Sequence, residues 1–380
     1  MRVKRRVKRP AVLHLLSGAV LLALLAACGE AESGSDAADT PAATDTGSAE
    51  AAGQSVPDAL EALEGLSADE RREQLIQLAL EEGGRVSVYT SMNSETADAA
   101  AEAFEADTGV AVLSYRAGAE DVRTRILQEA EANRVDVDVA WIGDSRLVPI
   151  REAGILTPYT SPHQDDLVEG AVSEYWTLNH YNIYTIAWNT DRVAEGEQPQ
   201  SYEDLTDPKW DGIMTLEPSD ADWYWSLSNY LREDQGFSEE ELEQYWQDVT
   251  SGVDFNSGHT STRALLVAGR YAVFASDFSK GIELEKVDGA PVEWLPAIEP
   301  LFATPEAAAI AAATPRPAAA ILFMDWLISD GQQVLYDLEV DVTRTDLQAL
   351  DDLEIRFVDA EEWAEVEADM VEEYQSRSGG

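Results

Sequence analysis

The chain has 380 residues, which is enough for two domains with a sizeable core. Its formal charge is −47, from 73 acidic and 26 basic residues, and six of the basic residues stand in the first nine positions. Neutralising phosphates requires basic clusters, so this composition excludes a nucleic-acid partner. The acidic excess indicates a well-hydrated surface, and a salt-rich habitat is a sharper explanation that the composition leaves open.

The first 27 residues have the pattern of an export signal peptide. The basic stretch Met1–Pro10 precedes the apolar stretch Ala11–Ala26, which is too short for a comfortable membrane span. The segment Leu25–Gly29 resembles the lipobox of bacterial lipoproteins, in which small residues precede a cysteine that receives lipid. We therefore expect lipidation of Cys28 and an extracytoplasmic protein anchored to the cell membrane. Residues 28–56 are small and polar without periodicity, which predicts a disordered tether.

One βαβ unit organises the chain that follows. Val86–Thr90 is a β-branched and aromatic run, typical of a buried strand. Alanines and Phe104 at positions 0, 3, 4 and 7 then predict a helix that Gly109 ends, and Val110–Tyr115 predicts a second strand. Ligands of open α/β sheets bind at the carboxyl ends of strands, so the polar loop Ser91–Ser94 is a candidate site.

Alternating strands and helices continue around this unit. Residues 57–84 predict an N-terminal helical segment, Asp121–Asn133 a helix, and Val137–Ile142 a strand that leads into Gly143 and a short helix. The pattern implies a largely parallel sheet covered on both faces.

The pattern beyond Pro158 predicts a second α/β lobe inserted into the first. Its aromatic run Tyr175–Trp188 predicts the strand that leaves the first lobe. The apolar segment Ala318–Ser329 predicts a buried helix. The other expected elements are Ser201–Trp210 (short helix and turn), Gly212–Glu217 (strand), Asp222–Leu231, Glu239–Val249 and Thr260–Ala268 (helices), Tyr271–Ala275 (strand), Val292–Leu295 and Ala308–Ala312 (return to the first lobe), and Glu361–Tyr374 (mostly surface helix).

Short stretches in a fixed order resemble a known family. They are Val88–Asn93 with Ala103–Glu105, Ser114–Gly118, Ile150–Leu156, Trp188–Thr190, Ser201–Leu205 with Asp207–Trp210, Gly258–Thr260, Gly289–Val292, and Ala318–Ser329 with Asp330–Gln332. With them the chain resembles the extracellular solute-binding proteins of ABC importers, in the iron(III)-transport-like branch.

The resemblance implies a two-lobe, type II periplasmic-binding-protein-like α/β fold, with mostly parallel sheets and a hinge of crossing strands. Lobe 1 would comprise residues 85–187 and 290–345, lobe 2 residues 188–289, and a helical extension residues 346–380. The implied function is capture of a small solute in the interlobe cleft and delivery to an ABC permease. We expect a monomer that needs no cofactor and is not an enzyme.

The cleft should be lined by loops at strand ends and by helix N-termini, whose free N–H groups suit anions. Tyr181 lies near the hinge, and Trp223 is the expected cleft residue of three consecutive aromatic residues. The expected ligand-binding residues are Ser91, Met92, Asn93, Gly143, Asp144, Tyr181, Ser219, Asp220, Trp223, His259, Thr260 and Asp277.

No metal ligand is expected among these residues. Ferric-ion-binding members of the family use a histidine after the first strand, a lobe-one glutamate and two adjacent tyrosines after the last lobe-two strand. Here Asn93 stands near the histidine position, and Ser276–Lys280 contains no tyrosine. The resemblance therefore favours a small organic or oxyanionic solute. Arg116 or Arg263 would favour an anion, whereas the nearby carboxylates would favour an amine, and the sequence does not choose.

Two other functions compete with solute capture. Gly143-Asp144-Ser145-Arg146 resembles the nucleophile block of GDSL-type esterases, although the histidines lack the expected Asp-x-x-His spacing and no Gly-x-Asn-Asp is present. A non-transport acidic surface lipoprotein is the other alternative, and it would need no cleft that closes.

Overall fold

A computed structural model describes residues 55–338, 340–347 and 353–378. The expected signal peptide, Cys28 and nearly all of the expected tether lie outside the described residues. The described helices are α1 (Val56–Ala62), α2 (Ala68–Glu81), α3 (Ser94–Thr108), α4 (Ala119–Glu131), α5 (Asp144–Glu152), α6 (Ala221–Glu233), α7 (Glu239–Ser251), α8 (His259–Val267), α9 (Ser279–Val287), α10 (Pro317–Leu327), α11 (Asp330–Asp337) and α12 (Ala360–Arg377).

The strands form one sheet with the order β2-β1-β3-β10-β5-β8-β6-β7, while β4 and β12 pair with β10, and β9 and β11 pair with β5. Pairing is parallel within β2-β1-β3 and within β8-β6-β7. The strands are β1 (Arg85–Thr90), β2 (Ala111–Arg116), β3 (Val139–Gly143), β4 (Leu156–Thr157), β5 (Thr177–Asn189), β6 (Met214–Leu216), β7 (Asp254–Phe255), β8 (Val273–Phe278), β9 (Val292–Glu293), β10 (Leu301–Ala311), β11 (Asp341–Val342) and β12 (Ile355–Phe357).

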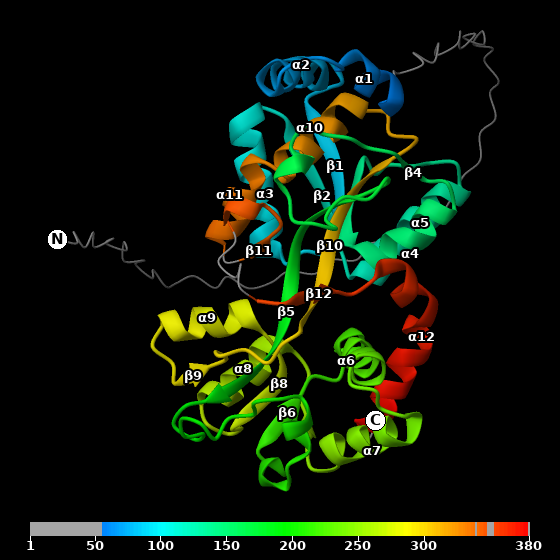
Figure 1. The fold of residues 1–380 in the computed structure, drawn as a ribbon. Coiled ribbons are helices and arrows are strands. Elements are labelled where there is room, and N and C mark those ends of the chain that lie inside the picture. The colour runs from blue at the N-terminus through cyan, green and yellow to red at the C-terminus, as the bar shows by residue number, and fades with distance from the viewer. Residues whose placement is uncertain (1–54, 339, 348–352, 379–380) are drawn as a thin grey trace, which may run out of the picture. The chain divides into compact units, whose positions relative to one another are not determined.

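Two long strands, β5 and β10, join the two parallel groups (Figure 1). They pair with each other antiparallel, while β10 also pairs with β3 and β5 also pairs with β8. This is the predicted hinge of crossing strands. The sequence placed the return strand at Ala308–Ala312, whereas β10 begins at Leu301. Pro305 and Glu306 interrupt the apolar pattern there, and proline inside a run argues against a strand.

The first apolar core lies around β1, β3 and the C-terminal part of β10, residues 307–311. As predicted, α10 is buried along its whole length in this core. Helix α2 packs against α10, and Arg71 of α2 donates to Asp325 of α10 from Nε over 2.7 Å. The hydroxyl of Tyr159 donates to the same carboxylate, so a buried polar network fixes the N-terminal helices on this core.

The second half has two apolar clusters on opposite sides of β8, one with α6 and α7 and one with α8 and α9. The helix α12 contributes Trp363 and Tyr374 to the first of these clusters. It runs from α5 to α6 and contacts both, as Figure 1 shows. The helix is mostly at the surface, as expected, and Ala360, Trp363 and Tyr374 are its buried residues.

Candidate ligand-binding site

A pocket of about 390 Å³ lies beside the crossing strands and receives residues from both halves. This volume falls in the range of small-molecule sites. Six expected residues line it: Ser91, Met92, Asn93, Tyr181, His259 and Thr260. Its other lining residues are Thr96, His180, Asn182, Ile183, Arg263, Phe278, Lys280, Gly281, Leu284, Glu306, Leu338, Val340 and Asp341.

The loop after β1 forms the first wall of the pocket. Asn93 caps α3, because its Oδ1 accepts from the backbone N–H of Thr96 over 3.0 Å. Arg116 donates from Nε to the carbonyl of Met92 over 2.6 Å, which fixes the loop. Arg116 thus holds the pocket wall and is not among the lining residues. The N-terminus of α3 presents its partial positive charge at this wall.

Arg263 of α8 brings a buried cation to the opposite wall. Its side chain is 10% exposed, and it forms a two-bond pair with Asp277, from Nε over 2.9 Å and from Nη2 over 2.6 Å. Gly281 makes room for the guanidinium, because a Cβ at that position would overlap Cζ, Nη1 and Nη2 of Arg263. Burial raises the pKa of Asp277 above its ordinary value, although Arg263 opposes that shift.

Asp277 therefore lies behind the pocket wall and not at the pocket surface. The sequence placed it in a loop after a strand ending at Ala275, but it belongs to β8 and is fully buried. The ion pair with Arg263 explains how a carboxylate can occupy a central strand. From the sequence, Arg263 was a candidate only on the condition that its side chain points into the cleft. The spacing of Arg263 and Asp277 along the chain did not predict that they form an ion pair.

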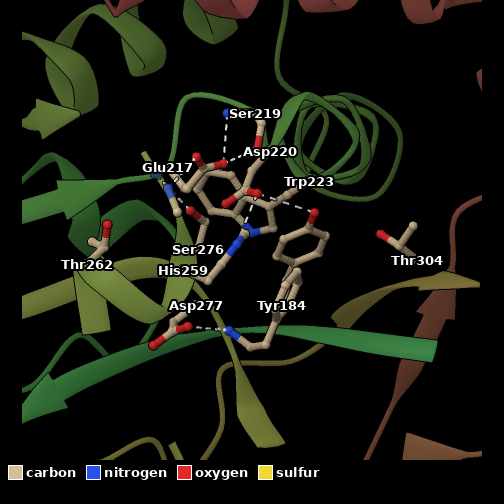
Figure 2. A network of polar contacts seen from close by, with 12 residues as sticks. Tyr184, Glu217, Ser219, Asp220, Trp223, His259, Thr262, Ser276, Asp277 and Thr304 are labelled. Atoms are coloured by element: carbon tan, nitrogen blue, oxygen red, sulfur yellow. Dashed lines mark hydrogen bonds and ion pairs between the residues drawn. The ribbon is translucent and has the colours of Figure 1, made fainter. Parts of the chain in front are cut away.

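His259, the first residue of α8, is the second cationic candidate in this wall. Its ring stacks on Phe278 with centroids 4.0 Å apart, and its Nε2 lies 3.2 Å from Oδ1 of Asp220 (Figure 2). Burial lowers the pKa of His259, but the contact with Asp220 and the negative charges of Asp220, Asp277 and Glu217 outweigh burial and raise that pKa overall. Burial raises the pKa of Asp220 to about 7, against the opposing effect of His259.

The loop after β6 supports His259 from behind. Oε2 of Glu217 accepts from the backbone N–H of Ser219 over 2.8 Å, and Oε1 accepts from that of Gly258 over 3.0 Å. Ser219, Asp220 and Glu217 thus form a layer behind the pocket, and none of them lines it. The nearest oxygen and nitrogen atoms of Glu217, Asp220 and His259 all lie within 4.8 Å of one another, a spacing that suits metal ligands.

Trp223 does not line the pocket. It is 1% exposed and packs edge-on against Trp246, with ring centroids 5.7 Å apart. Its neighbour Trp225 is partly exposed and contacts Trp363. Three consecutive aromatic residues on a helix point in different directions, and the sequence did not show that α12 would cover this side.

Gly143 and Asp144 lie at the N-terminus of α5, on the side of β10 opposite β5. They do not line the pocket, but Glu306, which pairs with Gly143 across the sheet, does. Burial raises the pKa of Glu306 to about 7 and raises that of Asp144 well above its ordinary value. Close to neutral pH, Glu306 therefore adds less negative charge to the pocket than its residue type suggests.

Esterase chemistry and ferric-ion binding can both be compared with the observed positions of their expected residues. Oγ of Ser145 accepts from Nη1 of Arg146 over 3.2 Å, and in the described part of the chain no hydrogen bond joins Ser145 to the histidine that esterase chemistry needs. At the positions that the family resemblance assigns to iron ligands, Asn93 caps a helix, and β8 ends with Phe278 followed by Ser279 and Lys280.

Among the described residues, no helix is long and apolar enough to cross a membrane.

Comparisons with known proteins agree with this architecture. Residues 90–334 match the family model of the bacterial extracellular solute-binding proteins. A protein of Haemophilus influenzae, described as uncharacterized, is 27% identical over 267 residues, which cover 67% of this chain and 75% of that protein.

Solved structures with the same fold include two with a bound ligand. Iron-bound HitA from Pseudomonas aeruginosa superposes with a TM-score of 0.65 at 16% identity, covering 76% of this chain and 99% of HitA. AfuA from Actinobacillus pleuropneumoniae, with exogenous fructose-6-phosphate bound, superposes with a TM-score of 0.62 at 23% identity, covering 78% of this chain and 99% of AfuA. The chain thus has the two-lobe α/β fold of type II periplasmic binding proteins.

Proposed function

The chain belongs to the bacterial extracellular solute-binding proteins, and we propose that it captures a small anionic solute in the pocket beside β5 and β10. The observation that carries this proposal is that the buried guanidinium of Arg263 lines the pocket. A guanidinium has five N–H donors, and the pair with Asp277 engages Nε and Nη2. The remaining donors suit a carboxylate or phosphate, which arginine binds with matching geometry.

The rest of the pocket supports an anion over an amine. Beyond the first nine residues the chain has three lysines, and one of them, Lys280, lines this pocket. The N-termini of α3, α8 and α9 contribute lining residues, and helix N-termini favour negative charge. Of the lining carboxylates, Glu306 has a pKa of about 7, so it opposes an anion only weakly in mildly acidic solution.

The solute class follows from what the pocket offers. HitA was solved with iron and AfuA with a sugar phosphate. The resemblance assigns ferric-ion binders a histidine near the position of Asn93 and two adjacent tyrosines after the last strand of lobe 2, but Ser276–Lys280 contains no tyrosine. An organic anion bearing a phosphate or carboxylate therefore fits better than a ferric ion.

Transport requires capture and delivery outside the cytoplasm. We infer that lobe 1 (residues 85–187 and 290–345) and lobe 2 (residues 188–289) close on the solute about β5 and β10. We also infer that the protein acts as a monomer, held at the membrane by lipid on Cys28, and passes the solute to an ABC permease. Membrane fractionation of cells producing Cys28→Ser should find the variant released from membranes, and retention would refute the anchor.

The ligand class can be tested by thermal shift and calorimetry with inorganic phosphate, citrate, glucose 6-phosphate, neutral glucose and cationic spermidine. We expect at least one anion to bind, and neither glucose nor spermidine to bind comparably. Arg263→Gln should weaken anion binding by about 10- to 100-fold, since a charge-assisted hydrogen bond contributes about 1.5–3 kcal/mol. The matched control is Arg232→Gln, because Arg232 pairs with Glu239 away from this pocket. Binding of spermidine in place of the anions, or equal anion binding by Arg263→Gln and wild type, would refute the proposal.

A further inference from the structure

Three potential metal ligands meet where His259 of the pocket wall reaches Glu217 and Asp220, which lie buried behind that wall. Glu217 directly follows β6, Asp220 directly precedes α6, and His259 begins α8. Each can offer one ligand atom, and these atoms lie within 4.8 Å of one another. Figure 2 shows the three side chains converging from separate segments, with Asp220 between Glu217 and His259. Of the three, only His259 lines the pocket.

Asp220 has an unsatisfied atom in this layer. The residue is 1% exposed, and its Oδ1 lies 3.2 Å from Nε2 of His259. Its other oxygen, Oδ2, is buried and has no hydrogen-bond partner among the described residues. Burying a carboxylate oxygen without a hydrogen-bond partner costs free energy of folding, so the position of Oδ2 requires an explanation.

A buried tyrosine of the same lobe, which stacks on Tyr224 of α6, is also unsatisfied. Tyr374 of α12 is fully buried, and its hydroxyl has no hydrogen-bond partner among the described residues. Burial and then the charges of Asp220, Glu217 and Asp222 raise the pKa of this phenol well above its ordinary value.

The charge of the layer is unbalanced as well. Glu217 and Asp220 are both buried, and Asp222 lies beside them, accepting from the hydroxyl of Tyr184 over 2.9 Å. In the part of the chain that the structure describes, these carboxylates form one ion pair, between Asp220 and His259. Hydrogen bonds account for the oxygens of Glu217 and Asp222, so Oδ2 of Asp220 is the carboxylate oxygen of this group that lacks a partner among the described residues.

We propose that Glu217, Asp220 and His259 bind a divalent transition metal of the zinc class. One imidazole nitrogen with two carboxylate oxygens is a ligand set that Zn²⁺ accepts, whereas Ca²⁺ and Mg²⁺ prefer oxygen ligands alone. Ligands at zinc distances lie about 3.3 Å apart in a tetrahedron, so the three side chains need to close by about 1.5 Å at most. The backbone amides of Ser219 and Gly258 and the hydroxyl of Ser219 already orient the carboxylate of Glu217, and they leave one lone pair free on Oε1.

The metal would join two loops that the chain does not connect directly. It would link the segment after β6 to the N-terminus of α8 and fix the ring of His259, which stacks on Phe278 in the pocket wall. Its positive charge would balance the buried carboxylates. The metal site does not depend on solute capture, because Glu217 and Asp220 contribute no surface to the pocket.

Co²⁺ is a suitable probe because its visible absorption reports coordination. The metal-free full chain is titrated with Co²⁺ in the absence of any solute, and Zn²⁺ is then added as a competitor. We expect one site per chain with the intense absorption of four-coordinate Co²⁺, and its loss when Zn²⁺ is added. Asp220→Asn and Glu217→Gln should each weaken binding at least about 10-fold.

The control Asp222→Asn changes an adjacent carboxylate that is not in the ligand set, and it should bind Co²⁺ as the wild type does. Circular dichroism and melting without metal check the fold of every variant, and Asp220→Asn suffices if Glu217→Gln does not fold. Weak absorption from six-coordinate Co²⁺ that is the same in all variants would reflect surface carboxylates and would overturn the proposal. That result would leave the anion binding test unaffected.

Discussion

Replacing Gly281 by alanine tests whether the backbone of α9 positions the pocket arginine. In an ordinary helix interior, Gly→Ala stabilises by about 1 kcal/mol. Here the new methyl would overlap the guanidinium of Arg263, which would have to move by more than about 1 Å to regain van der Waals contact. That movement breaks at least one of the two hydrogen bonds to Asp277, and a hydrogen bond to a charged group contributes about 1.5–3 kcal/mol.

The expected net effect is a loss of about 1–2 kcal/mol, opposite in sign to the helix propensity. Urea unfolding followed by tryptophan fluorescence measures it. The control is the same substitution in an Arg263→Ala background, where no guanidinium opposes the methyl and Gly281→Ala should stabilise. A Gly281→Ala protein as stable as wild type, or equal effects in both backgrounds, would refute the described packing of Arg263.

Two further predictions concern other buried carboxyl groups. Asp325→Asn should destabilise the chain by about 3–5 kcal/mol in urea unfolding, because it leaves Arg71 buried without its counter-charge; a loss below about 1 kcal/mol would show that the pair is exposed to water. The pKa of Glu306 is raised from 4.5 to about 7, so its stabilising contribution is complete below about pH 4.5 and is lost as the pH rises through 7. Stability measured from pH 5 to 8 should therefore fall more steeply in wild type than in Glu306→Gln, and parallel profiles would show that Glu306 is not perturbed.

Much of the fold could be read from the sequence because local signals agree with tertiary burial. The helix with Phe104 inward follows from the periodic spacing of its apolar residues, whereas the strand at Val86–Thr90 and the buried helix predicted at Ala318–Ser329 follow from continuous apolar runs. The beginning of β10 could not be predicted from the sequence, because Pro305 and Glu306 contradict strand propensity. Pairing with β5 and β3 holds these two residues in the strand.

The candidate site was predictable only in part. Ser91, Asn93 and His259 were found because they follow a strand or begin a helix, which is a local signal. Arg263 and Asp277 meet through tertiary packing, so the sequence assigned neither partner. Trp223 was placed in the cleft because nothing local showed that Trp246 would pack against it inside the second lobe.

Native mass spectrometry of the chain purified from its host without denaturation tests solute capture most directly. We predict a mass increment of one small molecule that fragments as an anion, and we predict that Arg263→Gln purified in the same way loses it. A wild-type chain that carries no such molecule and gains none from phosphate, citrate or glucose 6-phosphate would contradict anion capture, as would an increment that Arg263→Gln retains in full.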